Sequence, residues 1–219
     1  MITSPHNEKL KLIRRLGRRR SREREGLFIA EGEDLIAAAR DAGAEPVELL
    51  TAAGEGLGGT EVEPALLAGV SKLGSGTRAI GVWREVWAER ADPPCVYLHG
   101  ISDPGNVGTL IRTAHALVGG TVVLGPECAD PFGPHAVRAS MGAVFAEPLM
   151  RGGIDATPEP RAALVAHGGE PLEALDGMAT VCLGAEREGL PEATVERCDV
   201  RVTIRVREGA ESLNVAAAA

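Results

Sequence analysis

Aromatic side chains are scarce in this sequence: three Phe, two Trp and one Tyr make up 3% of its 219 residues, although 44% of the residues are hydrophobic. Its core must therefore consist mainly of Ala, Val, Leu and Ile. Long apolar runs are also missing, and none approaches the roughly 20 residues that a membrane-spanning helix needs. The N-terminal stretch MITSPHNEKLKLIRR lacks the apolar segment of a secretory signal. These absences favour a globular, cytoplasmic protein with no membrane partner.

Motifs for common cofactors are absent as well. The four cysteines are widely spaced and form no CxxC pair, which argues against a zinc ribbon or a disulfide scaffold. There is no GxxxxGK[ST] P-loop and no HExxH spacing, so no metal is expected. Residues 54–59 (GEGLGG) formally contain GxGxxG, but a poor helix start follows and no acid stands about 20 residues further on. They are interpreted as a surface loop, and a nicotinamide-dependent oxidoreductase, which rests on this loop alone, is the weakest alternative.

Charge is distributed unevenly along the chain. The net charge is −8, yet residues 1–24 contain nine Lys or Arg and two acids. A basic cluster on an otherwise acidic chain suits neutralisation of phosphates, because each contact releases condensed counterions. The alternative is a solvated basic helix end. The candidate RNA-binding residues are Arg14, Arg15, Arg18, Arg19, Arg20 and Arg22.

The apolar pattern predicts an α/β protein of two domains, 1–90 and 91–219, separated by the charged, Pro-containing stretch at 88–94. The first domain is predicted to contain helices at 10–16, 31–42 and 64–72 and strands at 27–29, 47–50 and 80–87. For the second, the pattern predicts strands at 96–98, 121–124, 144–149, 179–183 and 200–204, and helices at 105–118, 134–141, 159–166, 191–197 and from 212 onward. This alternation predicts a mostly parallel sheet covered on both faces, with ligands at the carboxyl ends of its strands.

Three glycine-bounded polar stretches follow strands of the second domain. The first, PGNVGTLIRTA, has Asn106 in the turn that enters a helix and Arg112 further along it. An arginine on an otherwise apolar helix face needs an anion or a partner, unless it snorkels to solvent. The second stretch, LGAEREGLP, contains Glu186, and the third contains Ser212, a candidate helix N-cap, and Asn214. Because all three follow strands of one sheet, they are expected to converge on one ligand.

In order and spacing these stretches resemble motifs 1, 2 and 3 of the SpoU/TrmH branch of the SPOUT RNA methyltransferases, with SLNVAAAA as motif 3. The segment Arg138-Ala139-Ser140-Met141-Gly142 is similar to a further signature of the family. The N-terminal stretch RSREREGLFIAEGEDLI resembles the family's small substrate-binding domain, which is similar in fold to ribosomal protein L30e. The resemblance covers essentially the whole chain.

The resemblance implies an L30e-like RNA substrate-binding domain over 1–90 and, over 91–219, a SPOUT domain whose parallel sheet is tied in a trefoil knot. It implies a homodimer in which motif 1 of one subunit meets motifs 2 and 3 of the other. The implied cofactor is S-adenosyl-L-methionine (AdoMet), and the implied acceptor is a ribose 2′-hydroxyl of structured RNA, 23S-type rRNA being favoured over tRNA. The implied cofactor-binding residues are Leu183, Gly184, Ile204, Val206, Leu213, Ser140 and Met141.

The implied catalytic residue is Arg112, with Asn106, Glu186, Ser212 and Asn214 positioning it and the ribose. Methyl transfer from a sulfonium is an in-line displacement that needs alignment and a destination for the hydroxyl proton. Arginine holds its proton at any ordinary pH, so we expect it to act as a cation that binds RNA phosphate and stabilises the developing alkoxide. Literal proton abstraction is the alternative.

Two features depart from the family pattern. The family often has Ile-Pro-Met before motif 3, whereas Arg205 and Arg207 flank Val206 here. The printed chain ends at Ala219, within the helix that motif 3 is expected to open. Both features leave open a catalytically silent RNA-binding paralogue of the same fold.

Overall fold

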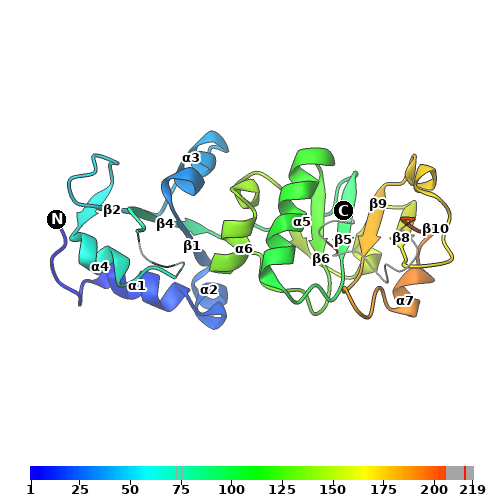
Figure 1. Ribbon diagram of the computed structural model, residues 1–219, viewed down its shortest axis with the longest axis horizontal. Helices are drawn as coiled ribbons and strands as arrows, with labels where there is room; N and C mark the ends of the chain where they lie inside the picture. Colours follow the sequence, from blue (N-terminus) through cyan, green and yellow to red (C-terminus); the bar gives the residue numbers. More distant parts are fainter. Residues whose placement is uncertain (73, 75, 206–214, 216–219) are drawn as a thin grey trace. The chain divides into compact units, whose positions relative to one another are not determined.

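The structure is a computed structural model that describes residues 1–72, 74, 76–205 and 215. The chain forms two compact units (Figure 1). The first consists of Met1–Glu85 and Asp130–Ala146, and the second of Val86–Ala129 and the chain from Glu147 onward. Residues 130–146, which the sequence pattern grouped with 91–219, thus belong to the unit that contains the N-terminus.

The first unit is built on a four-stranded sheet in the order β1-β4-β2-β3. Its strands are β1 (Leu27–Glu31), β2 (Glu48–Ala52), β3 (Thr60–Val62) and β4 (Ala79–Arg84), antiparallel except for the β2/β3 pair. Its helices are α1 (Glu8–Leu16), α2 (Arg19–Glu25), α3 (Glu33–Asp41), α4 (Pro64–Ala68) and α6 (Pro134–Ala139), followed by the 3₁₀ turn η1 (Ala143–Phe145). Leu10, Ile13 and Leu16, the predicted apolar stripe of the first helix, are fully buried in this core.

Four of the six aromatic side chains meet in the first unit, which explains why residues 130–146 belong to it. The ring of Phe28 in β1 lies 4.8 Å from Phe132 and 5.6 Å from Phe145, centroid to centroid. Trp83 in β4 lies 5.0 Å from Phe145. Helix α6 lies between Phe132 and Phe145 in the sequence, and Figure 1 shows it beside β1. Aromatic rings dominate core energetics by area, so this cluster fixes the segment to the sheet.

The second unit has a six-stranded sheet in the order β10-β8-β9-β5-β6-β7, in which every pair is parallel. Its strands are β5 (Cys95–Leu98), β6 (Thr121–Leu124), β7 (Leu149–Arg151), β8 (Arg161–Leu164), β9 (Thr180–Leu183) and β10 (Val200–Val202). Its helices are α5 (Pro104–Leu117) and α7 (Glu192–Val195), with 3₁₀ turns η2 (Ile154–Ala156) and η3 (Leu172–Leu175). All four β5 residues are buried, as expected of a central strand in a parallel sheet. The predicted parallel α/β sheet is confirmed.

Several predicted elements differ from the structure. The predicted helix at 159–166 is wrong: Arg161–Leu164 forms strand β8, paired with β9 and β10. Its sequence, RAAL, consists of good helix formers, and pairing on both sides overrides that propensity. The predicted strand at 144–149 begins only at Leu149. Helix α2 and strand β3 were not expected; α2 reads RRSRERE and so carries no apolar periodicity. The expected trefoil knot and the helix from residue 212 involve a part of the chain that lies largely outside the described residues.

Within the described ranges, every helix is too short or too polar to cross a membrane.

Candidate active site

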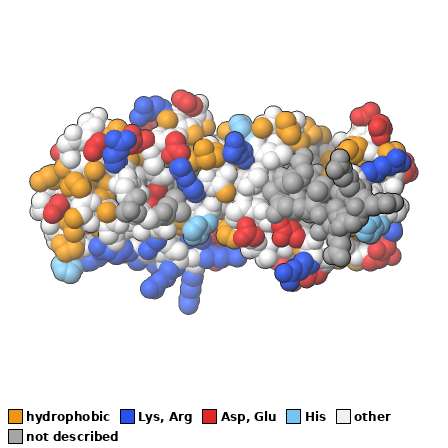
Figure 2. Space-filling view, viewed as in Figure 1, with side chains coloured by type: hydrophobic (Ala, Val, Ile, Leu, Met, Phe, Trp, Pro, Cys, Tyr) orange, Lys and Arg blue, Asp and Glu red, His pale blue; other side chains and the backbone are white. Residues whose placement is uncertain are grey.

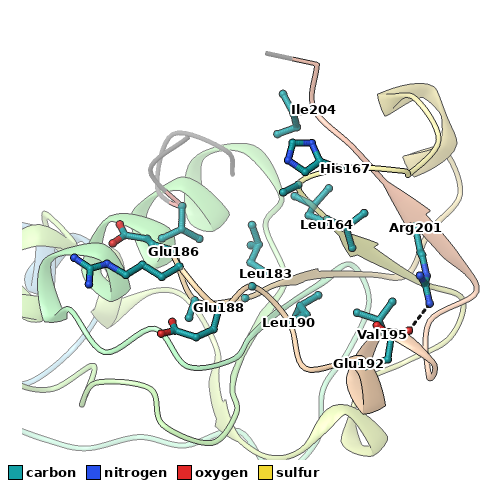
Figure 3. Close-up of a pocket in the computed structure, with 17 residues that line it drawn as sticks. Leu164, His167, Leu183, Glu186, Glu188, Leu190, Glu192, Val195, Arg201 and Ile204 are labelled. Carbon is teal, nitrogen blue, oxygen red and sulfur yellow. Dashed lines mark hydrogen bonds and ion pairs between the residues drawn. The ribbon is translucent and has the colours of Figure 1, made fainter. Parts of the chain in front are cut away.

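A cavity of about 750 Å³ lies at the carboxyl ends of β8, β9 and β10. In Figure 3, Leu183 lies between Glu186 and Glu188 on one side and Leu164 and His167 on the other. The walls come from residues 164–167, 183–190, 192, 195, 201, 204 and 215. This is the edge at which open parallel sheets bind ligands. Of the expected cofactor-binding residues, Leu183, Gly184 and Ile204 line the cavity.

The loop after β9 is closed upon itself by its own backbone. Ala185 N donates to Gly189 O at 3.1 Å, and Gly189 N donates to Ala185 O at 2.8 Å. Gly189 has a φ of 68°, which glycine adopts without strain. A Cβ on Gly184 would lie only 2.1 Å from the carbonyl carbon of Gly189, so no side chain fits there. The glycines of LGAEREGLP therefore set the wall of the cavity.

Helix α5 brings the first polar stretch to this loop. Pro104 occupies its first turn, and the N-cap side chain of Asp103 accepts a hydrogen bond from Asn106 N at 2.8 Å. Asn106 Nδ2 in turn donates to Glu186 Oε1 at 2.6 Å. Two stretches 80 residues apart in sequence thus meet within one chain, at the rim of the cavity.

Arg112 lies elsewhere on α5. It is exposed, six residues beyond Asn106, and at 100° per residue it faces a different side of the helix. It has no hydrogen bond or ion pair with another residue of the described part of the chain, and it does not line the cavity. Within the described residues, Arg112 therefore does not contribute to the cavity of its own chain.

The remaining expected site residues fall into two sets. Val206, Ser212, Leu213 and Asn214 lie outside the described residues. Ser140 and Met141 belong to the first unit, at the end of α6, and are not among the residues that line the cavity. Ser140 is buried and its Oγ donates to Val137 O at 2.7 Å, while Met141 is about half exposed. Their part in cofactor binding stays a prediction.

Most of the basic N-terminal cluster is exposed. Arg14, Arg15, Arg18, Arg19 and Arg20 all reach solvent from α1, α2 and the turn between them. Figure 2 shows Lys and Arg side chains gathered along the edge of the first unit where α1 and α2 lie. Arg18 and Arg20 have no ion pair with any residue that the structure describes.

Arg22 corrects the sequence-based prediction for this cluster. Its side chain is only 4% exposed, and it forms an ion pair of 2.6 Å with Asp130, which is 7% exposed. A further guanidinium nitrogen donates to Leu16 O at 2.8 Å. A buried cation saturated in this way cannot reach an RNA phosphate, so Arg22 is structural: it ties α2 to the start of segment 130–146.

Sequence reasoning missed several residues of the cavity. Leu164 ends β8 and His167 follows it; because the sequence pattern predicted a helix at 159–166, it did not predict a strand end at this point. Arg201 in β10 and Glu192 in α7 form an ion pair of 2.7 Å at the wall, visible as a dashed line in Figure 3. Both residues lie just outside the recognised stretches, and neither belongs to a motif pattern. No group of three or more His, Cys, Asp or Glu in the described ranges is placed to hold a metal.

A cavity at the carboxyl edge of a parallel sheet, walled by a closed, glycine-bounded loop, is the arrangement in which α/β proteins bind small molecules. The family model of the SpoU rRNA Methylase family matches residues 93–219, and that of the MRM3-like substrate binding domain matches residues 7–92. The chain therefore belongs to the SpoU rRNA methylase family, which confirms the resemblance seen in its motifs.

Solved structures of similar proteins extend over both units. The AdoMet-bound rRNA methyltransferase from Sinorhizobium meliloti superposes with a TM-score of 0.86 at 28% identity, covering 99% of this chain and 93% of that one. The SpoU methyltransferase AviRb from Streptomyces viridochromogenes, in complex with AdoMet, gives a TM-score of 0.81 at 25% identity, covering 97% and 94%.

Curated relatives are similar to this chain over part of its length. The 23S rRNA (guanosine(2553)-2′-O)-methyltransferase RlmP of Bacillus subtilis is 32% identical over 131 residues, 56% of this chain and 53% of that protein. An uncharacterized tRNA/rRNA methyltransferase of Mycobacterium tuberculosis is 35% identical over 136 residues, 56% of this chain and 47% of that protein. The chain spans about half the length of the curated relatives it matches.

Proposed function

We propose that this chain methylates a ribose 2′-hydroxyl of structured RNA with AdoMet as the methyl donor, and that the RNA is rRNA rather than tRNA. The observation that carries the proposal is the 2.6 Å hydrogen bond from Asn106 to Glu186, which joins the motif 1 and motif 2 stretches at the rim of the 750 Å³ cavity. The names of the AdoMet-bound S. meliloti protein and of B. subtilis RlmP support the cofactor and the 2′-O-methylation of rRNA. The similarity to a bacterial rRNA methyltransferase supports the proposal that the chain acts in the cytoplasm.

The cavity suits a cofactor of this size and charge. Its volume falls within the roughly 300–1,000 Å³ of typical small-molecule sites. Leu164, Leu183 and Ile204 offer apolar walls, while Glu186 and Glu188 bring negative charge that favours a sulfonium. When bound, AdoMet supplies an electrophilic methyl group. The closed loop after β9 presents backbone groups to it, and Val206, Leu213, Ser140 and Met141 complete the proposed cofactor-binding set.

Arg112 is proposed to bind the RNA phosphate and to stabilise the alkoxide that develops on the ribose. Ser212 and Asn214, together with Asn106 and Glu186, would orient the ribose. Because Arg112 is exposed and does not line the cavity of its own chain, we propose that it serves the cavity of a second copy in a homodimer. In this arrangement Arg112, which has no ion pair with the described residues of its own chain, would meet the RNA phosphate bound at the partner subunit's cavity.

RNA docking is proposed for the exposed arginines of α1 and α2. The match of residues 7–92 to a substrate binding domain supports this assignment, as does the absence of ion pairs at Arg18 and Arg20 within the described residues. Arginine forks hydrogen-bond phosphate oxygens in pairs, which suits a structured RNA backbone.

The test is transfer of a labelled methyl group from AdoMet to unmodified rRNA and tRNA fractions, measured side by side with AdoMet binding. We expect label in the rRNA fraction, abolished by a 2′-deoxy substitution at the mapped site. Label in tRNA alone would change the substrate class. If the chain binds RNA but does not bind AdoMet and transfers no labelled methyl group, it would be the catalytically silent paralogue.

A further inference from the structure

Two cysteines are in contact next to the cavity. Cys182 lies in β9 and Cys198 lies between α7 and β10, with their sulfurs 3.8 Å apart and both thiols free. Leu183, the neighbour of Cys182, lines the cavity, and so does Val195, three residues before Cys198. We infer that a hydroperoxide converts Cys182 and Cys198 into a reversible disulfide, and that this bond deforms the cavity and weakens cofactor binding. The second half of this inference rests on the proposed function.

The surroundings assign different roles to the two thiols. Cys182 is fully buried against Cys95, Tyr97 and Val123, whereas Cys198 is partly exposed, so an oxidant in solution reaches Cys198 first. The hydrogen bond between the two sulfurs lowers the pKa of Cys198. The positive charge of Arg161 also lowers it, while burial and the charge of Asp199 act in the opposite direction. The same sulfur–sulfur contact, together with burial, raises the pKa of Cys182. Cys198 is therefore the attacking sulfur, because the thiolate is the reactive form.

The chemistry takes two balanced steps. The Cys198 thiolate attacks one oxygen of hydrogen peroxide; the O–O bond breaks, Cys198 becomes a sulfenic acid and hydroxide leaves. Cys182 then attacks the sulfenic sulfur; the S–O bond breaks, the S–S bond forms, and the thiol proton leaves with the hydroxyl as water. Two electrons pass from the two thiols to the peroxide, and a dithiol returns them when it reduces the bond.

The other two cysteines are poor competitors. Cys95 is buried on β5, opposite Thr180 rather than Cys182, and burial raises its pKa to about 11. Cys128 lies outside this cluster, with its sulfur 3.4 Å from Leu98 O. Only the Cys182–Cys198 pair combines sulfur contact with an exposed member, among the four cysteines that the sequence contains.

Bond formation has to move the walls of the cavity. A disulfide holds its sulfurs about 2.05 Å apart, so the two chain segments must approach by an amount on the order of 1–2 Å. Leu183 adjoins one sulfur, and Glu192 and Val195 of α7 stand just before the other. The backbone that carries these lining residues shifts with the bond.

The covalent prediction is tested on the full chain with hydrogen peroxide, followed by N-ethylmaleimide under denaturing conditions and trypsin. Arginines at 90, 112, 138, 161, 187, 197 and 201 place all four cysteines in separate tryptic peptides. We expect a linked pair of peptides 162–187 and 198–201, absent in Cys198→Ser and unchanged in the matched control Cys128→Ser. Over-oxidation of Cys198 without the link, or a link through Cys95, would overturn the inference.

The functional half is tested by AdoMet calorimetry on the reduced, oxidised and re-reduced chain. We expect affinity to fall on the order of ten-fold on oxidation, equivalent to about 1.4 kcal/mol, and to return with dithiothreitol. Cys198→Ser should keep its affinity in peroxide. If the disulfide forms and AdoMet affinity does not change, the disulfide is not coupled to cofactor binding, and the proposed function still stands. A reduced chain that does not bind AdoMet would overturn both the coupling and the proposed function, leaving the peptide map as a separate result.

Discussion

Asn106 Nδ2 donates a hydrogen bond of 2.6 Å to Glu186 Oε1, although the two residues lie 80 positions apart in the chain. The backbone N–H of Asn106 donates to the N-cap side chain of Asp103, which holds Asn106 at the start of α5. Glu186 lies in a loop that is closed by backbone hydrogen bonds between Ala185 and Gly189. The bond therefore joins two rigid pieces, and it sets where the rim of the cavity stands relative to the start of α5.

Asn106→Ala removes this bond and should lower kcat on the order of 10–100-fold, because a small misplacement of a positioning group is costly, while AdoMet affinity changes much less. Single-turnover methyl transfer and calorimetry measure the two quantities. Asn7→Ala is the matched control: Asn7 caps α1 in the other unit and accepts from Lys9 N at 2.9 Å. It should cost about 1 kcal/mol of stability without changing turnover. Equal loss of turnover in both variants would contradict a specific role for Asn106.

Arg112→Ala should keep AdoMet affinity and reduce turnover on the order of 100–1,000-fold, because it removes a cation aimed at developing negative charge. Arg40→Ala changes an exposed arginine of α3 and provides the control for net charge. Arg112→Lys should recover little, since lysine lacks the planar fork. Loss of AdoMet binding in Arg112→Ala would argue against this role.

Mixing Arg112→Ala with Glu186→Ala tests whether Arg112 serves a second copy. If each site combines Arg112 of one subunit with Glu186 of the other, a random mixture recovers roughly a quarter of the wild-type sites. Activity after subunit exchange is the measurement, and each variant mixed with itself is the control. No recovery, with exchange shown by mass, would assign Arg112 to its own chain.

Replacing Arg18, Arg19 and Arg20 with Ala should weaken RNA binding and flatten its salt dependence, because each lost phosphate contact lowers the slope of log K against log salt by about 0.7–0.9. Filter binding at several salt concentrations measures this slope. A triple change at Arg40, Arg84 and Arg90 removes the same charge from other exposed positions. An equal effect of both triples would mean that net charge, rather than this surface, governs binding.

Arg22→Ala should destabilise the first unit by about 3–5 kcal/mol, because it leaves the Asp130 carboxylate buried and unpaired. Adding Asp130→Ala should restore part of that loss, which a double-mutant cycle in urea would measure. A stable Arg22→Ala variant with weakened RNA binding would return Arg22 to the RNA-binding set.

Local signals in the sequence predicted much of this structure. The stripe of Leu10, Ile13 and Leu16 and the proline-initiated helix α5 depend on neighbours along the chain, and both are present. Strand β8 was missed because its pairing with β9 and β10, rather than its own residues, determines its conformation. The pairing of Arg22 with Asp130 spans 108 positions, so only the folded chain distinguishes Arg22 from its exposed neighbours.

The residues of the cavity also divide into those that the sequence could predict and those that only the fold brings together. Leu183, Gly184 and Ile204 could be predicted because they belong to, or directly precede, recognisable motifs. His167 and Arg201 could not, because neither residue belongs to a recognisable ligand-binding motif. They reach the cavity only because β8 and β10 are neighbours in the sheet.

The aromatic cluster of Phe28, Trp83, Phe132 and Phe145 has a consequence for how the chain is made. Half of these rings are translated about 50 or more residues after the last strand of their own sheet. The aliphatic core cluster of the N-terminal unit lies within residues 2–82, but its aromatic cluster cannot form until Phe145 has left the exit tunnel. A fragment that ends near residue 90 would lack Phe132 and Phe145, and so would expose Phe28 and Trp83 to solvent. It would also lack Asp130, the carboxylate that pairs with the guanidinium of Arg22.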